Sequence, residues 1–195
     1  MKFRKSKQKR PEIRSLLDMR KVLYDQKWGK KTPNFPVYYM YRKIKEKNDL
    51  RYDVTIIPSR MLGKEFPKTL GHEHSGYFQE LYEVINGKAI FLLQKVKDRQ
   101  ITDVEAIKAK RDEKVIVPKG YGHITINPSK RSLKMGNWVS RRCHNTYSLF
   151  KKMKGGCYYY TQLGWIKNKN YKKIPRLKFG KPLKKLPKNL GFLNR

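Results

Sequence analysis

Apolar residues follow helical spacing at the start of the chain and strand spacing from Phe35 onward. Between residues 11 and 25, a proline near the first turn and the apolar positions that follow predict an amphipathic helix. Later segments are short and either alternate in polarity or are rich in β-branched and aromatic residues, so they predict strands. These strands are expected over residues 37–43, 52–57, 81–85, 89–94, 101–109, 114–117, 123–127, 133–140 and 156–162, with a short helix over 146–153.

Turn signals separate the predicted strands, and the strongest is the pair Asn86-Gly87. This dipeptide is typical of a tight hairpin, because both turn positions take a positive φ, so the strands on either side are expected to pair. Many short strands with few helices between them favour an antiparallel sandwich or barrel. We expect a basic arm and helix over residues 1–33, the barrel over 34–164 and a basic strap over 165–195.

The chain is strongly basic, and the charge is unevenly distributed. It holds 48 Lys and Arg against 15 Asp and Glu, a net charge of +33, and residues 141–195 contain 16 basic residues and no acid. An aromatic content of 12% is too high for a disordered polycation. No apolar stretch approaches the roughly 20 residues of a membrane span, and none follows the basic start as in a signal peptide. Two cysteines, Cys143 and Cys157, cannot form a disulfide framework. A soluble, folded, cytoplasmic protein is therefore expected.

The tail from Lys167 to Arg195 interleaves lysines with apolar residues, and its three prolines exclude a long helix. This pattern favours an extended strap whose apolar side chains pack on the core while the lysines reach solvent. The alternative is an arm that binds nucleic acid or the ribosome, because Lys and Arg release counterions from phosphate. We favour the strap.

Three of the four histidines and one glutamate lie in two short segments. The first contains His72 and His74, which point to the same face if they lie on a strand, followed by Glu80. In the second, a glycine-rich turn precedes His123 at the start of a predicted strand. Three imidazoles and one carboxylate suit one divalent transition metal ion, such as Fe, Mn, Ni, Co or Zn. These four residues are the predicted metal ligands.

The spacing of these residues resembles the two sequence motifs of the cupin superfamily. The matching positions are His72, His74, Glu80 and Gly87 for the first motif, and Pro118, Gly120, His123 and Asn127 for the second. The gap between His74 and Glu80 is slightly longer than usual, and Asp112 stands where a glycine is expected. The resemblance implies a mostly β fold, the cupin double-stranded β-helix or jelly-roll barrel, here with an N-terminal helix and an extended basic C-terminal strap.

A narrower resemblance, over roughly residues 36–147, is to the cupin-type (archaeal) glucose-6-phosphate isomerase family. It rests on Gly63-Lys64-Glu65-Phe66, Thr69, Gly71-His72-x-His74, Glu80-x-Tyr82 and Leu92-Leu93-Gln94. The resemblance implies a metal-dependent aldose–ketose isomerase that interconverts glucose 6-phosphate and fructose 6-phosphate. Glu80 is the family's candidate base, Tyr82 and His144 are alternatives, and a metal-assisted hydride shift would need no base.

The family's pattern also implies the contacts to the sugar phosphate. Thr55, Thr69 and the backbone of Gly71 are expected at the phosphate, because backbone N–H groups on turns can approach its oxygens. Tyr39 stands at the spacing of a sugar-contacting tyrosine.

One position departs from the family. Trp138 replaces a tyrosine, so Arg141 or Arg142 is expected to supply the lost phosphate contact as a bidentate donor.

Two other functions stay open from the sequence. The chain could be a cupin-fold protein that binds RNA or the ribosome through its basic ends, or a cupin of another chemistry, such as a dioxygenase or a different isomerase. The complete set of four ligands favours an enzyme, and Thr55, Thr69 and a cationic rim disfavour an oxygenase of apolar substrates. The expected partners are a small sugar phosphate and a second copy in a homodimer, without a membrane. Nucleic acid is a possible further partner, which is not favoured.

Overall fold

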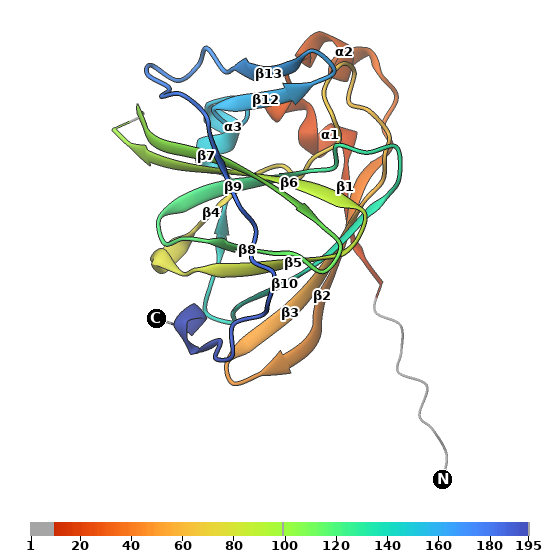
Figure 1. The fold of residues 1–195 in the computed structure, drawn as a ribbon. Coiled ribbons are helices and arrows are strands. Elements are labelled where there is room, and N and C mark those ends of the chain that lie inside the picture. The colour runs from red at the N-terminus through yellow and green to blue at the C-terminus, as the bar shows by residue number, and fades with distance from the viewer. Residues whose placement is uncertain (1–9, 99, 195) are drawn as a thin grey trace.

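The computed structural model describes residues 10–98 and 100–194, and most of the predicted basic arm therefore lies outside the described residues. The described chain is mostly β, as predicted, and most of its strands form two facing sheets (Figure 1), while β4 with β11 and β12 with β13 form two small two-stranded sheets. The strands are β1 (Glu12–Ser15), β2 (Pro36–Lys47), β3 (Leu50–Ile57), β4 (Glu73–His74), β5 (Glu80–Asn86), β6 (Lys88–Lys97), β7 (Gln100–Lys110), β8 (Lys114–Val117), β9 (Tyr121–Ile126), β10 (Leu133–Ser140), β11 (Asn145–Thr146), β12 (Tyr158–Thr161), β13 (Gly164–Lys167) and β14 (Lys178–Gly180). The helices are α1 (Leu16–Met19), α2 (Gln26–Lys31) and α3 (Ser148–Lys152), with 3-10 turns η1 (Arg20–Val22), η2 (Ser75–Tyr77) and η3 (Gly191–Asn194).

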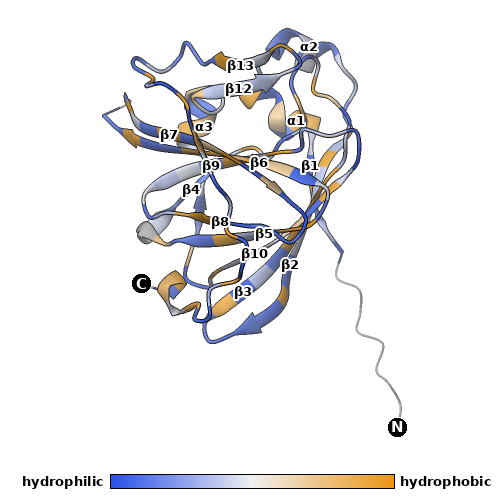
Figure 2. Cartoon of the chain, in the orientation of Figure 1, coloured by the Kyte–Doolittle hydropathy of each residue, from blue (hydrophilic) through white to orange (hydrophobic). Residues whose placement is uncertain are grey.

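One sheet has the strand order β1-β2-β3-β10-β5-β8, and the facing sheet has the order β14-β7-β6-β9. Buried apolar side chains from both sheets fill the space between them, and Figure 2 shows the apolar and hydrophilic stretches of the strands. In the described part of the chain, no helix is long and apolar enough to cross a membrane.

The predicted hairpin at Asn86-Gly87 is wrong, although strands flank it on both sides. β5 pairs with β10 and β8, whereas β6 pairs with β7 and β9 in the other sheet. Of the two residues, Gly87 alone has a positive φ, 91°, whereas the tight hairpin turn needs two. The turn carries the chain around a corner from one sheet to the other.

The predicted N-terminal helix is much shorter than its apolar pattern. Residues 12–15 form β1, which pairs with the edge of β2, and only residues 16–19 are α-helical before η1. Ser15 caps this helix, because its backbone N–H and its hydroxyl both donate to the Asp18 carboxylate, at 2.8 and 3.0 Å. Pairing with an open sheet edge therefore outweighs the helical preference of the first turn.

The C-terminal tail is a strap that crosses the outside of the barrel (Figure 1). β14 pairs in parallel with β7, Leu183 exchanges two backbone hydrogen bonds with Lys114, and Leu193 is fully buried against the outer face. The expectation that all apolar residues of the strap pack inward is wrong for three of them, because Phe179, Leu183 and Leu186 are exposed.

Candidate metal centre

The two histidine segments meet because their backbones are hydrogen-bonded to each other. The N–H of His72 donates to the carbonyl of His123 at 3.2 Å, and the N–H of His123 donates back at 2.9 Å. His74 follows in β4, and Glu80 begins β5 in the same region. The strands of the barrel thus bring residues up to fifty positions apart to one place.

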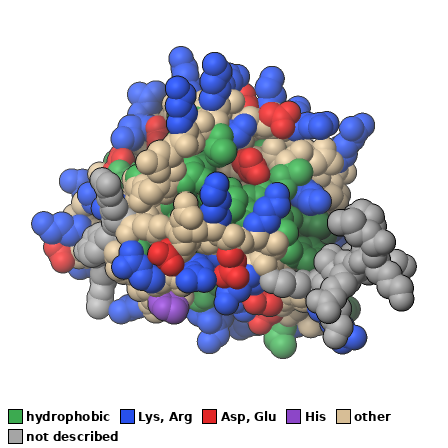
Figure 3. Space-filling view, turned by 90° about the horizontal axis from the view of Figure 1, so that it is seen from below, with side chains coloured by type: hydrophobic (Ala, Val, Ile, Leu, Met, Phe, Trp, Pro, Cys, Tyr) green, Lys and Arg blue, Asp and Glu red, His purple; other side chains and the backbone are tan. Residues whose placement is uncertain are grey.

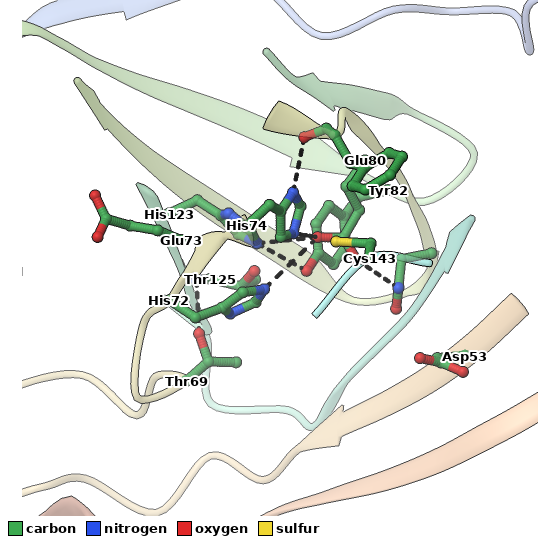
Figure 4. Close-up of polar contacts among 12 residues, drawn as sticks. Asp53, Thr69, His72, Glu73, His74, Glu80, Tyr82, His123, Thr125 and Cys143 are labelled. Atoms are coloured by element: carbon green, nitrogen blue, oxygen red, sulfur yellow. Dashed lines mark hydrogen bonds and ion pairs between the residues drawn. The ribbon is translucent and has the colours of Figure 1, made fainter. Parts of the chain in front are cut away.

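The ligand atoms of His72, His74, Glu80 and His123 all lie within 4.8 Å of one another. In Figure 4 the three imidazoles point toward the Glu80 carboxylate, whereas Glu73 points away. One carboxylate oxygen, Oε2, is 3.1 Å from Nε2 of His74, 3.2 Å from Nε2 of His123 and 3.8 Å from Nε2 of His72. The structure therefore gathers the four predicted ligands in one cluster.

Burial and hydrogen bonding set the charges of this cluster. Burial would raise the pKa of Glu80, but its hydrogen bonds to His123 and His74 outweigh it and hold that pKa well below the usual range. Burial lowers the pKa of His72 and of His123, so both imidazoles are neutral. For His74, hydrogen bonds to Cys143 and Glu80 outweigh burial and raise the pKa to about 10. Without an added cation, a protonated His74 balances the carboxylate.

Two observations show that these residues fit a divalent metal ion. Nε2 of His72 is buried and, in the described part of the chain, has no hydrogen-bond partner, although such an atom normally has one. Nδ1 of His74 is 2.9 Å from the carbonyl oxygen of Phe78, which can only accept a hydrogen bond. Nδ1 therefore carries the proton, and the opposite nitrogen can offer its lone pair to a metal ion.

Two further groups hold the cluster in place. Asn137, on β10, donates from Nδ2 to Oε1 of Glu80 at 2.5 Å. The hydroxyl of Tyr82 lies 3.0 Å from Nε2 of His123, and burial and Glu80 raise the pKa of Tyr82 well above its usual value. Asn137 was not among the site residues predicted from the sequence. The sequence did contain a signal for it: Asn137 is a polar residue on the same face of a predicted strand as the apolar residues Met135 and Val139, and this face is buried.

A narrow cavity opens beside the cluster, with a volume of about 30 Å³. Thr55, Thr69, Gly71 and Tyr82 line it, as expected for residues near a substrate. Tyr39 does not, because side chains alternate along β2, so the neighbouring Tyr38 lines the cavity. The hydroxyl of Tyr38 accepts a hydrogen bond from the backbone N–H of Leu70 at 3.3 Å.

Three other predicted site residues lie elsewhere, as does Trp138, which replaces the family's tyrosine. His144, Arg141 and Arg142 are exposed and are not among the described residues that line the cavity. Arg141 pairs with Asp49 at 3.2 Å, and Arg142 donates to the backbone carbonyl of Asn194 at 2.7 Å. Trp138 lies on the outer face of β10 and contacts the ring of Tyr52. It therefore faces away from the cavity, and the arginines that follow it in sequence lie beyond the end of that strand.

Two other arginines line the cavity, Arg42 from β2 and Arg51 from β3. Both bond the fully buried carboxylate of Asp53, at 3.0 and 3.1 Å. The pairing of β2 with β3 shifts register between Tyr41 and Lys45, next to Arg42. Register shifts of this kind re-aim side chains, so this arginine was difficult to place from sequence.

A family model described as glucose-6-phosphate isomerase (GPI) matches residues 13–176, most of the chain, and the predicted family resemblance is confirmed. No curated protein matches.

Several solved structures are similar in part. An oxalate oxidase in complex with glycolate is 14% identical, with a TM-score of 0.47, and the match covers 60% of this chain and 57% of that one. The capsular polysaccharide assembling protein CapF from Staphylococcus aureus is 20% identical, with a TM-score of 0.43 and coverage of 52% and 27%. A cupin-2 domain containing protein from Shewanella frigidimarina is 21% identical, with a TM-score of 0.37 and coverage of 51% and 78%. The matched part spans 55% or less of peruvianin-I from Thevetia peruviana and of CapF.

Proposed function

The chain belongs to the glucose-6-phosphate isomerase family, of the cupin type, and from this premise we propose that it interconverts glucose 6-phosphate and fructose 6-phosphate. The observation that carries the proposal is the cluster of His72, His74, Glu80 and His123 beside a cavity that arginine and threonine side chains also line. These four residues would hold one divalent transition metal ion, whose nitrogen and oxygen ligands suit Fe, Mn, Ni, Co or Zn. When bound, such an ion supplies Lewis-acid stabilisation of negative charge on the sugar oxygens.

Aldose–ketose isomerisation moves hydrogen between adjacent carbons, and the cavity narrows the choice of groups that could assist. Among the described residues that line it, Glu80 is the only carboxylate. Its Oε1 accepts a hydrogen bond from Asn137, and service as a metal ligand would lower its basicity further, so Glu80 would be a weakened base. The Tyr82 hydroxyl, with its raised pKa, keeps its proton and is suited to donate to a sugar oxygen. His144 is not supported in this role, because it does not line the cavity.

The phosphate group would be bound by Thr55, Thr69 and the backbone of Gly71, with Arg51 as the cationic group. Arg51 is oriented by Asp53 and by the carbonyl of Cys143, at 3.1 and 3.2 Å, and its remaining N–H donors can bind an anion. A cavity of about 30 Å³ holds little more than one or two water molecules. Side chains in the wall must therefore move before a hexose phosphate can enter.

A coupled assay on fructose 6-phosphate tests the proposal. We expect activity that a chelator removes and a divalent metal restores, and that His123→Ala abolishes. His144→Ala is the matched control, since this histidine is exposed, and it should retain activity. Activity that survives both chelation and His123→Ala would contradict the proposal. Deuterium from D₂O at C2 of the product would indicate proton transfer, and its absence a hydride shift.

Location and assembly are further parts of the proposal. Both cysteines are free and buried, which suits a reducing compartment such as the cytoplasm. The homodimer stays a prediction, and the mass from light scattering at physiological salt tests it.

A further inference from the structure

A second hollow, of about 450 Å³, lies between the segment that precedes α2 and the chain around β12 and β13. Leu23, Tyr24 and Gln26 line one side of it, and Tyr159, Lys167 and Lys169 are among the residues on the other. No described residue lines both this groove and the metal cavity. We call it the Tyr24 groove.

Buried contacts fix the walls of the Tyr24 groove. The backbone N–H of Tyr24 donates to Oε2 of Glu65 at 3.0 Å, and the other oxygen of this buried carboxylate pairs with the buried Lys68 at 2.5 Å. The ring of Tyr24 is 42% exposed and lies 5.5 Å, centroid to centroid, from the ring of Tyr159. Opposite, the buried side chain of Asn168 donates to two backbone carbonyls, at 2.8 Å each. The aromatic ring is therefore presented at a defined place.

The charge of the Tyr24 groove is entirely positive. Lys154, Lys167 and Lys169 line it and are exposed, and in the described part of the chain none of them forms a salt bridge. No acidic residue is among the described residues that line the groove. The nearest acid in sequence, Asp25, uses Oδ1 to accept a hydrogen bond from the backbone of Trp28 at the start of α2. Among the described residues, these lysines thus have no acidic counterion.

From this juxtaposition we propose that the Tyr24 groove binds single-stranded RNA, with one base stacked on Tyr24 and the adjoining phosphates on the three lysines. An exposed aromatic ring beside unpaired cations is the combination that binds single strands, because every base offers a face for stacking and every linkage carries a charge. The side-chain amides of Gln26 and Asn170, which also line the groove, can hydrogen-bond the 2′-hydroxyls that distinguish RNA from DNA. This site is independent of the isomerase reaction.

Basic side chains are also scattered over the face of the molecule in Figure 3, so the experiment needs a control matched in charge. The probe is a fluorescein-labelled oligouridylate of about ten nucleotides, measured by anisotropy with the full-length, metal-loaded protein in roughly 0.1 M salt. The groove variant is Lys154→Gln/Lys167→Gln/Lys169→Gln. The control is Lys97→Gln/Lys108→Gln/Lys119→Gln, which removes the same charge from exposed lysines elsewhere.

We expect the groove variant to bind at least about tenfold more weakly and the control variant to stay within about twofold of the wild type. Loss of three phosphate contacts should also reduce the slope of log affinity against log salt by about 2, since each contact contributes about 0.7 with single strands. Tyr24→Leu should weaken binding by about 5- to 100-fold, the range for loss of one stacked base, and Tyr24→Phe should not. All variants should keep their isomerase activity.

Three results would overturn the proposal. The first is absence of binding by the wild type. The second is an equal loss in the two lysine variants, which would mean attraction by general charge. The third is deoxyoligonucleotide binding as tight as that of RNA, which would make the groove a general single-strand site. The two lysine variants decide the matter even if Tyr24→Leu proves unstable, and the isomerase assay separates these results from failure of the proposed function.

Discussion

The metal cluster and the C-terminal strap both join oppositely charged groups from distant parts of the chain, but they differ in their access to water. In the cluster, Glu80 and the three imidazoles have side chains at most 13% exposed. On the strap, Lys178 pairs with Asp103 and Lys184 with Glu113, and the two lysine side chains are 59% and 76% exposed. The same kind of contact therefore has different consequences at the two places.

Removing one member of a buried set leaves the others charged or unpaired in a medium that solvates them poorly. At the surface, water replaces a lost partner at little cost. We conclude that the charges of the cluster serve catalysis and depend on one another, so that the loss of one affects the others. The strap, in contrast, is held mainly by its apolar anchor Leu193 and its backbone pairing. The variants below test this contrast, beginning with the largest effect.

Glu80→Gln and Glu113→Gln make the same change at the two places. Glu80→Gln removes the negative charge from the cluster and should lower isomerase activity about 1000-fold or more, since Lewis-acid stabilisation is worth several kcal/mol. Glu113→Gln should stay within about twofold of the wild type. The measurements are the coupled assay and the metal content of each purified protein. If Glu80→Gln keeps its metal and its rate, Glu80 is not a ligand.

Leu193→Ala tests whether an apolar anchor holds the strap. This side chain is fully buried, so its truncation should lower the free energy of unfolding by about 3 kcal/mol. Leu186→Ala is the matched control, because Leu186 is 46% exposed and should cost no more than about 0.5 kcal/mol. Urea unfolding measures both. Equal losses would show that the strap end does not depend on its buried contact.

Asn137→Ala removes the side chain that orients Glu80 without removing a ligand. An outer partner of this kind typically contributes 10- to 100-fold to metal affinity or activity. We therefore expect a loss in that range, with a smaller effect on stability. Asn189→Ala, at an exposed strap residue, is the control. Unchanged metal affinity in Asn137→Ala would contradict a positioning role.

The metal cluster was predictable from sequence, because a strand places His72 and His74 on the same side and the spacing to Glu80 and His123 is a motif. Most strands were also predictable, since their polarity alternates locally. The pairing of the strands was not predictable from sequence. Gly87 has the positive φ of a turn, but whether β5 and β6 pair with each other depends on the other strands of the two sheets, which lie far away in the sequence.

The cavity wall was less predictable than the ligands, because a shift of one residue on a strand moves a side chain to the opposite face. Tyr38 replaces Tyr39 for this reason. Arg42 and Arg51, rather than Arg141 and Arg142, line the cavity, because a register shift lies beside Arg42 and buried Asp53 holds both.

The smallest effect concerns the ion pairs of the strap and their dependence on pH. Hydrogen bonds from Lys178 and Lys184 lower the pKa of Asp103 and of Glu113 below their usual values. Such carboxylates contribute fully to the stability of the docked strap at pH values above the pKa they have in the unfolded chain, about 4. This contribution is lost as the pH falls through their lowered pKa in the folded protein. The protection factor of the backbone amide of Leu183, which is its intrinsic exchange rate at each pH divided by the observed hydrogen-exchange rate, should therefore fall below about pH 4.

Lys184→Gln should reproduce part of this loosening at neutral pH while costing less than about 1 kcal/mol, because the lysine side chain is 76% exposed. High salt should have a similarly small effect on the wild type and almost none on the variant. If Lys184→Gln instead destabilised the protein as much as Leu193→Ala does, the strap would be held by electrostatics. Its ion pairs would then resemble those of the buried cluster, and the distinction between the two regions would be lost.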